Sequence, residues 1–266
     1  MDMSFWNPFK PTPPLVAVIR LQGTIANVAR GLDDTGLAPV IEKAFAKGKP
    51  KAVCLQINCP GGSPVQTSLI AARIRRLAED KDVPVFAFVE DVAASGGYWL
   101  ACAADEVFVD ETSMVGSIGV ISAGFGLNQL IDKYGVERRV HTSGTSKSML
   151  DPFRPEKPED VARLEGWLED IHQVFTAYVK KRRGAVLADN PALFTGEVWI
   201  GQKAVDQGLV DGIGHLVPVM KARFGDKVKF RKYGPKKGFL SRFGAEALSG
   251  AQAQLEDRAA FARFGL

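Results

Sequence analysis

Short apolar runs alternate with amphipathic stretches along the first half of the chain, beginning at residue 15. The apolar runs predict strands at residues 15–21, 52–58, 83–89 and 106–109. Apolar side chains at helical spacing predict helices at residues 37–46 and 65–78, and a short helix at 95–103. Strands and helices in this order are typical of βαβ units. We therefore expect an α/β fold with a mostly parallel sheet and flanking helices.

The second half of the chain carries one longer helical pattern, at residues 159–181. Six apolar side chains share one face of it: Val161, Leu164, Leu168, Ile171, Phe175 and Tyr178. A glycine-rich turn at 210–214 precedes a last helix and a strand near 228–231. We divide the chain into an N-terminal extension (1–14), one domain (15–234) and a tail (235–266), which is either a loosely attached helix or an oligomer contact.

Charge adds little to this picture. The chain has 34 basic and 30 acidic residues, a net charge of +4, and no basic stripe of the kind that binds nucleic acid. The densest basic run, residues 180–183, closes the long helical pattern, where cations suit the helix dipole. We predict that this run is a solvated surface and that no nucleic acid is bound.

The cysteines and the apolar runs indicate in which cellular compartment the protein is expected. Three cysteines without a CxxC pair argue against a disulfide framework and a zinc site, so we expect reduced core thiols. The longest apolar run, 115–127, is interrupted by glycines and falls short of the roughly 20 residues that cross a bilayer. We expect neither a signal peptide nor a transmembrane helix, and a cytoplasmic protein. Phe5, Trp6 and Phe9 leave a peripheral membrane contact open.

Three segments that follow predicted strands carry candidate chemistry: residues 58–62, 93–97 and 143–147. Ligands of parallel sheets gather at the carboxyl ends of strands, so we expect these segments to converge. Ser95 lies between small residues at a turn into a helix, where its hydroxyl is accessible to a substrate. The backbone N–H groups of Gly96 and Gly62 are candidates for an oxyanion hole, which lowers the barrier to acyl transfer.

A serine nucleophile needs a base, and the residues alone leave that base open. Of the histidines, His141 is the reserve candidate, because it lies close to Lys147 near the end of a strand pattern. A lysine serves as a base when burial lowers its pKa from about 10.4 toward 7–8. A lysine in a loop rich in glycine and serine is by default solvated.

The motifs around these residues resemble the signal peptide peptidase A family, Ser–Lys dyad peptidases of the Clp-protease/crotonase fold. The similarity covers roughly residues 16–230 and follows the short, single-copy form of the family. It rests on five segments in order: residues 58–62, 93–99, 115–120, 144–154 and 208–211. The resemblance implies a fold of repeated ββα and βαβ units.

The resemblance also implies roles for individual residues. Ser95 aligns with the family's nucleophile, Lys147 with its general base, and Ser117 with a hydroxyl that orients the lysine amine. Gly62 and Gly96 align with the oxyanion hole, and no metal or cofactor is implied. Short members of the family assemble into rings in which a neighbouring subunit can supply the lysine, so a homo-oligomeric ring is expected.

Three functions follow as hypotheses. The first is a serine endopeptidase that cleaves apolar peptides, such as signal-peptide remnants or membrane-protein fragments. The second is a crotonase-like acyl-CoA enzyme, which would share the oxyanion hole but has no use for a serine at the turn. The third is a non-catalytic, peptidase-like scaffold, which needs neither Ser95 nor Lys147.

Overall fold

A computed structural model describes residues 12–28, 31–144, 146–234, 255 and 257–266. Most of the predicted N-terminal extension (1–11) and most of the predicted tail (235–254 and 256) lie outside the described residues. The limits assigned to those two segments remain predictions.

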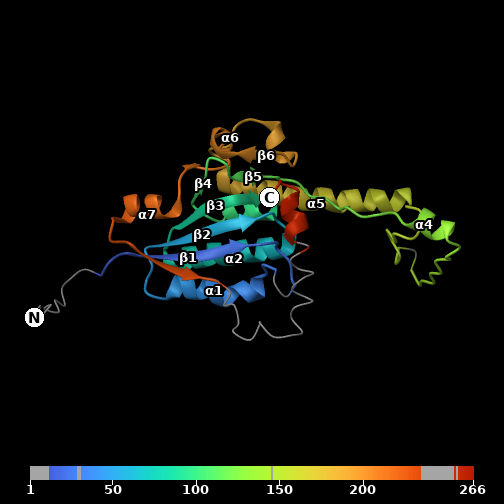
Figure 1. Cartoon of the computed structure of the whole chain (residues 1–266), viewed down its shortest axis with the longest axis horizontal. Helices are drawn as coiled ribbons and strands as arrows, with labels where there is room; N and C mark the ends of the chain where they lie inside the picture. The colour runs from blue at the N-terminus through green and yellow to red at the C-terminus, as the bar shows by residue number, and fades with distance from the viewer. Residues whose placement is uncertain (1–11, 29–30, 145, 235–254, 256) are drawn as a thin grey trace, which may run out of the picture.

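An eight-stranded, mostly parallel sheet forms the centre of the described structure (Figure 1). Its main path runs β6-β5-β3-β2-β1-β8, β4 pairs with both β3 and β7, and only β5 and β6 pair antiparallel. The strands are β1 (Leu15–Gln22), β2 (Ala52–Cys59), β3 (Val85–Ala94), β4 (Glu106–Val109), β5 (Met114–Gly116), β6 (Val198–Ile200), β7 (Gly212–Ile213) and β8 (Lys229–Tyr233). The predicted α/β class with a parallel sheet and flanking helices is confirmed.

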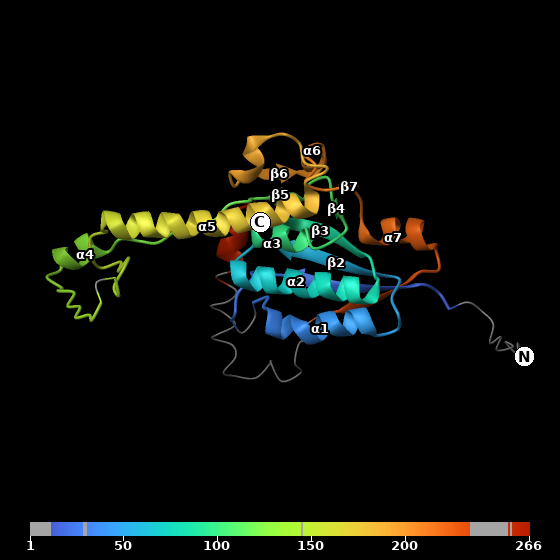
Figure 2. The same ribbon diagram turned by 180° about the vertical axis from the view of Figure 1, so that it is seen from behind.

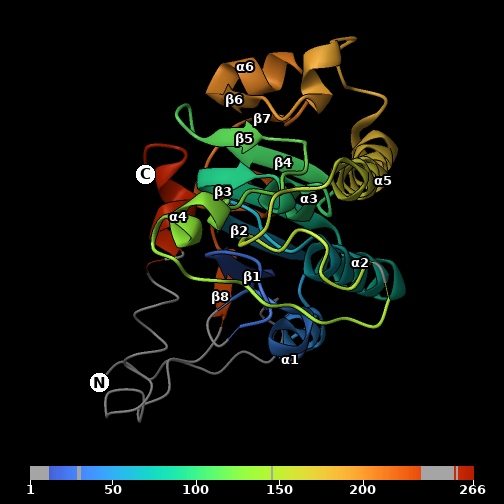
Figure 3. The same cartoon turned by 90° about the vertical axis from the view of Figure 1, so that its right-hand side faces the viewer.

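Helices cover both faces of the sheet. They are α1 (Asp34–Ala46), α2 (Pro64–Lys81), α3 (Gly96–Ala101), α4 (Asn128–Lys133), α5 (Pro158–Arg183), the 3-10 helix η1 (Pro191–Phe194), α6 (Gly201–Asp206) and α7 (Leu216–Phe224). Figures 2 and 3 show α1, α2, α3 and the C-terminal half of α5 on one face, whereas α7 packs on the other. With helices on both faces, the central strands are buried on both sides, which explains why they read as continuous apolar runs.

The first two helices begin where side chains satisfy free backbone N–H groups. Asp33 accepts a hydrogen bond from Gly36 N at 2.9 Å at the start of α1. Ser63 accepts one from Gln66 N at the start of α2, with Pro64 in the first turn. N-terminal caps of this kind stabilise a helix by about 1 kcal/mol each. The N-cap of α2 also sets where the loop after β2 ends.

The basic run at residues 180–183 is not simply solvated, which corrects the prediction. Arg183 is only 6% exposed, and its guanidinium donates to Gly208 O at 2.9 and 3.1 Å and to the Asp211 carboxylate at 2.7 Å. The neighbouring Arg182 donates to Cys102 O at 2.8 Å. These arginines tie the end of α5 to the turns beside α3, because a buried guanidinium must be paired.

The N-terminal half of α5 and the segment from residue 121 to residue 157 project beyond the sheet (Figures 1 and 2). Of the six apolar side chains predicted on one face of this helix, only Phe175 is fully buried. Tyr178 packs against the core through its stack on Trp99, and the other four side chains are half-buried. The strand expected to lead to Ser143 is absent, and residues 135–142 are irregular. We call residues 121–157 the projection.

No helix in the described part of the chain combines the length and the apolar character needed to cross a membrane.

Candidate active site

Ser95 occupies the turn between β3 and α3 in a backbone conformation that serine rarely adopts, with φ +52° and ψ −122°. Hydrogen bonds on both sides hold it there. Its N–H donates to Gly116 O at 2.8 Å, and its carbonyl accepts from Trp99 N at 3.0 Å. Strained residues persist only where their surroundings determine them, and they are concentrated at functional sites. The serine itself is partly exposed.

The length of β3 decides where this turn falls, and the predicted strand at 83–89 ends too early. β3 continues to Ala94, because Val92, Ala93 and Ala94 pair with the short strand β5. The sequence pattern misses this extension, since β5 has only three residues and leaves too short a run to recognise.

The loop after β2 places Gly62 beside this turn. Ile25 bridges the loop: its N–H donates to Gly61 O at 2.8 Å, and its carbonyl accepts from Ser63 N at 2.7 Å. Both glycines have a positive φ, +110° at Gly61 and +138° at Gly62. A Cβ on Gly62 would lie 2.1 Å from Ile25 O, so only glycine fits this position.

The amide groups of Gly62 and Gly96 come close together near Ser95. In the parallel bridge with Ile25, the neighbours of Gly62 make the hydrogen bonds, so the N–H of Gly62 is on the opposite side. Gly96 is the first residue of α3, where N–H groups have no partner within the helix. A Cβ built on Gly96 would lie 3.5 Å from Gly62 N. Within the described part of the chain neither amide has an acceptor, so both are available to an oxyanion.

Ser117 lies next to Ser95 because it follows the neighbouring strand. Ala94 of β3 is in register with Gly116 of β5, so the next residue of each strand emerges at the same edge. Ser117 also has a positive φ, +50°, and its N–H donates to Glu197 O at 2.7 Å. Both serines line one cavity.

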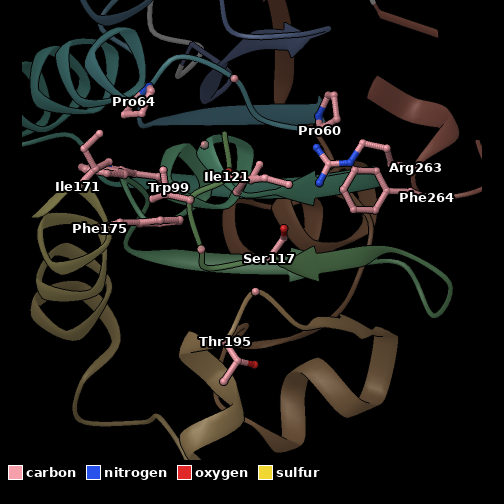
Figure 4. Close-up of a pocket in the computed structure, with 16 residues that line it drawn as sticks. Pro60, Pro64, Trp99, Ser117, Ile121, Ile171, Phe175, Thr195, Arg263 and Phe264 are labelled. Carbon is pink, nitrogen blue, oxygen red and sulfur yellow. The ribbon is translucent and has the colours of Figure 1, made fainter. Parts of the chain in front are cut away.

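This cavity has a volume of about 440 Å³ and is open to solvent (Figure 4). Trp99, Ile171 and Phe175 form one end of it, and Figure 4 shows Pro60 at the other end, beside the C-terminal part of the chain. The Trp99 and Phe175 rings stack with centroids 4.9 Å apart. The aromatic end suits an apolar side chain.

Lys147 does not reach this cavity within the chain. It is exposed and belongs to the projection, between α4 and α5, and His141 is exposed in the same segment. The expectation that three segments converge is therefore wrong for the third, because residues 121–157 leave the sheet after β5. No histidine or lysine is found among the described residues that line the cavity.

The remaining histidines lie elsewhere. His215 contacts the Asp110 carboxylate at 2.9 Å on the side of the sheet that carries α7, and this bond lowers the pKa of Asp110 to about 2. His172 is a half-buried residue of α5.

Cys59 precedes the glycine loop but is unsuited to act as a nucleophile. It is buried, and burial raises the pKa of its thiol to about 12. Cys54 and Cys102 are also buried and unpaired, which confirms the prediction of core thiols. Among the described residues, no group of three or more His, Cys, Asp or Glu side chains is placed to hold a metal.

Several residues of the cavity are not predicted by the sequence pattern, and two of them come from the far end of the chain. Arg263 and Phe264 line the cavity, although they belong to the tail. No pattern near them indicates a site, because they follow an alanine-rich stretch far along the chain from Ser95.

Comparison with known proteins shows which protein family this chain is similar to. The model of peptidase family S49 matches residues 77–224. A Brucella melitensis protein named Na(+)/H(+) antiporter NhaA is 44% identical over 278 residues, which cover 97% of this chain but 38% of that protein. The chloroplastic serine protease SPPA of Arabidopsis thaliana is 34% identical over 209 residues, which cover 76% of this chain and 31% of that protein. The chain thus spans well under half of these two relatives.

A relative of similar size and a solved structure complete the comparison. The Synechocystis protein slr0021, named as a protease, is 31% identical over 208 residues, which cover 78% of this chain and 73% of that protein. A point mutant of the 1510-N membrane-bound stomatin-specific protease superposes with a TM-score of 0.53 at 14% identity, covering 85% of this chain and 100% of that one. At that identity, the structural likeness concerns the fold alone.

Proposed function

Because the chain belongs to peptidase family S49, we propose that it is a serine endopeptidase with Ser95 as its nucleophile. One observation carries this proposal: Ser95 is held in a strained turn beside two backbone amides, of Gly62 and Gly96, that have no acceptor in the described structure. This arrangement matches what acyl transfer requires, namely an accessible hydroxyl and preorganised donors for the developing negative charge.

The proposed reaction has two steps. The Ser95 hydroxyl attacks the scissile carbonyl and loses its proton to a neutral amine, while the N–H groups of Gly62 and Gly96 bind the oxyanion. When the tetrahedral intermediate collapses, the ammonium returns the proton to the leaving amine and an ester remains on Ser95. Water then attacks this ester while the amine takes a proton from it, and the ammonium returns that proton to the Ser95 oxygen as the bond to the carboxylic acid product breaks.

We assign the amine to Lys147 of a second copy of the chain. The cavity has no base of its own among the described residues, and Lys147 lies on the projection, where it is exposed. Ser117 lies beside Ser95 and would orient the incoming amine through its hydroxyl. Contact with the partner would exclude water around the incoming amine, and desolvation disfavours the charged form of an amine.

The surface of the projection supports association with a second copy. Large apolar side chains are exposed along it and on the adjoining part of α5: Ile121 68%, Phe125 86%, Leu130 51%, Tyr134 72%, Val136 55% and Trp167 50%. Apolar patches of this kind mark interaction sites. A second copy is the occupant we propose, because the site is incomplete without a base. Repetition of this contact around an axis would give a ring.

The proposed substrates are extended, apolar peptides. The aromatic end of the cavity, formed by Trp99, Ile171 and Phe175, suits an apolar side chain. The loop at Gly62 and the segment after Ser117 flank the cavity, and their backbones are available to a peptide that adds as a strand.

The decisive test combines two variants. Purified Ser95→Ala and Lys147→Ala proteins, assayed separately by mass spectrometry on an unfolded apolar polypeptide, should each be inactive. An equal mixture, dissociated and reassociated, should recover about a quarter of wild-type activity, since a quarter of neighbouring pairs would combine an intact serine with an intact lysine. Without recovery, the lysine acts within one chain or is not the base.

Other outcomes would favour the alternatives. Cleavage that survives Lys147→Ala but not Ser95→Ala would move the base to His141 or another group. A folded, oligomeric wild type without any cleavage would contradict the peptidase. In that case saturable binding of coenzyme A would support an acyl-CoA enzyme, and its absence a scaffold.

A further inference from the structure

The described end of the chain lies against the candidate active site. Residues 257–262 are helical and lie at the carboxyl ends of β1, β2 and β3 (Figure 1). The Asp257 carboxylate accepts two hydrogen bonds from Thr24, at 2.9 Å from the backbone N–H and at 2.5 Å from the hydroxyl. Charged acceptors make hydrogen bonds about twice as strong as neutral ones. This segment is thus attached at a definite place, the turn after β1.

The same turn supports the glycine loop of the active site. Gly23 N donates to Asn58 O at 3.0 Å, and Ile25, two residues on, makes the bridge that holds Gly61 and Gly62. Attachment at Thr24 therefore places the C-terminal segment next to the loop whose amide we assign to the oxyanion hole.

This attachment brings Arg263 into the cavity. Arg263 and Phe264 lie beside Pro60, at the end opposite Trp99 and Phe175 (Figure 4). Of the described residues that line the cavity, Arg263 alone is charged. Its side chain is exposed, and within the described part of the chain no carboxylate oxygen lies within 4.0 Å of the guanidinium.

We propose that Arg263 is a specificity-determining residue that selects peptides with a carboxylate at the Pro60 end of the cavity. The inference rests on the proposed peptidase function and adds a substrate class to it: peptides that combine an apolar side chain at the aromatic end with a negative charge at the other. The carboxylate comes from an Asp or Glu side chain, or from the C-terminus of a short peptide. A guanidinium recognises either through two parallel N–H···O bonds.

The preference for a carboxylate should be modest, because Arg263 is exposed to solvent. Exposed ion pairs are worth about 0.2–1 kcal/mol, which corresponds to a rate difference of up to about five-fold. We expect a preference of about three- to five-fold in kcat/KM for a Glu peptide over its Gln counterpart. The preference should fall at high salt, which screens exposed charges.

The test uses the whole chain and matched peptides that differ only in having Glu, Gln or Lys at one position, which is scanned on both sides of the scissile bond. C-terminally amidated and free-acid forms separate a side-chain carboxylate from a terminal one. Arg263→Glu should abolish the preference for Glu at the selected position and favour Lys, measured as the ratios of kcat/KM between the matched Glu, Gln and Lys peptides for each protein. Arg258→Glu is the matched control, because Arg258 is exposed on the helix that precedes Arg263 but does not line the cavity.

A second variant tests the attachment itself. Asp257→Ala removes the acceptor for Thr24 and should also weaken the preference for Glu, without the reversal toward Lys. Identical Glu-to-Gln ratios for wild type and Arg263→Glu, in enzymes that still cleave, would overturn this inference alone. Absence of cleavage of every peptide by wild type would overturn the proposed peptidase, and the inference with it.

Discussion

At the scale of single residues, the backbone of Ser95 is the feature with the clearest energetic consequence. Its φ of +52° lies in a region of backbone conformation that is unfavourable for every residue except glycine. Holding a residue in such a conformation costs about 1–3 kcal/mol, which the surrounding hydrogen bonds must offset. A strained serine at this turn holds its hydroxyl beside the amides of Gly62 and Gly96 before any substrate binds.

This strain can be measured with two variants that both lack the hydroxyl. Ser95→Gly should be about 1 kcal/mol more stable to unfolding than Ser95→Ala, because glycine adopts the positive φ without strain, even after its larger loss of entropy. Urea unfolding followed by circular dichroism checks the difference. Equal stability of the two proteins would mean that the turn relaxes when the hydroxyl is removed.

At the scale of elements, the close contact between α3 and β2 decides where the nucleophile lies. A Cβ on Gly97 would lie 2.2 Å from Cys59 O, so the helix approaches the strand at a distance that only glycine permits. On its other side, α3 packs against α5, where the Trp99 ring stacks on Tyr178 with centroids 5.1 Å apart. The helix is also tied to a distant turn, because the Tyr98 hydroxyl donates to Leu209 O at 2.7 Å.

Gly97→Ala should therefore destabilise the protein strongly. We expect a loss of about 3 kcal/mol in the free energy of unfolding, since the added methyl meets backbone rather than a movable side chain. Gly166→Ala in α5 is the control. A Cβ there meets nothing within 4 Å, and alanine should stabilise the helix by about 0.5–1 kcal/mol. A small effect of Gly97→Ala would show that α3 can move away from β2.

At the scale of the whole molecule, the projection stands out because packing on the sheet does not account for its position. Residues 121–157 extend away from the sheet and are held together by hydrogen bonds among themselves, such as Leu127 N to Pro152 O at 2.6 Å. An ion pair between Arg138 and Asp151 at 3.2 Å adds to these contacts. A segment that is ordered and apolar on its surface fits the proposed contact between copies.

If this contact forms, a charge within it should weaken association. Phe125→Glu should shift the protein toward smaller species in sedimentation velocity, because Phe125 is 86% exposed and a buried glutamate would lack a partner. Val217→Glu is the matched control, since this exposed side chain lies on α7, outside the projection. An unchanged sedimentation profile for Phe125→Glu would exclude Phe125 from any contact between copies.

The local pattern of the sequence was sufficient to predict much of the fold. Buried strands and amphipathic helices are recognised because burial imposes a period of two or of 3.6 residues, or a continuous apolar run, on the sequence itself. The turn at Gly62 was recognisable for a related reason: a tight turn with positive φ admits few residue types. The adjacency of Gly62 and Ser95 followed from parallel strands whose carboxyl ends share one edge.

Contacts between distant segments were decided by the tertiary structure alone. The end of β3 depends on its pairing with the three-residue strand β5, which has no pattern of its own. Arg263 reaches the cavity because Asp257 binds Thr24, a contact over 233 positions that local periodicity does not encode. The separation of Lys147 from Ser95 has the same origin, since the path of residues 121–157 away from the sheet depends on what they pack against and not on their local sequence.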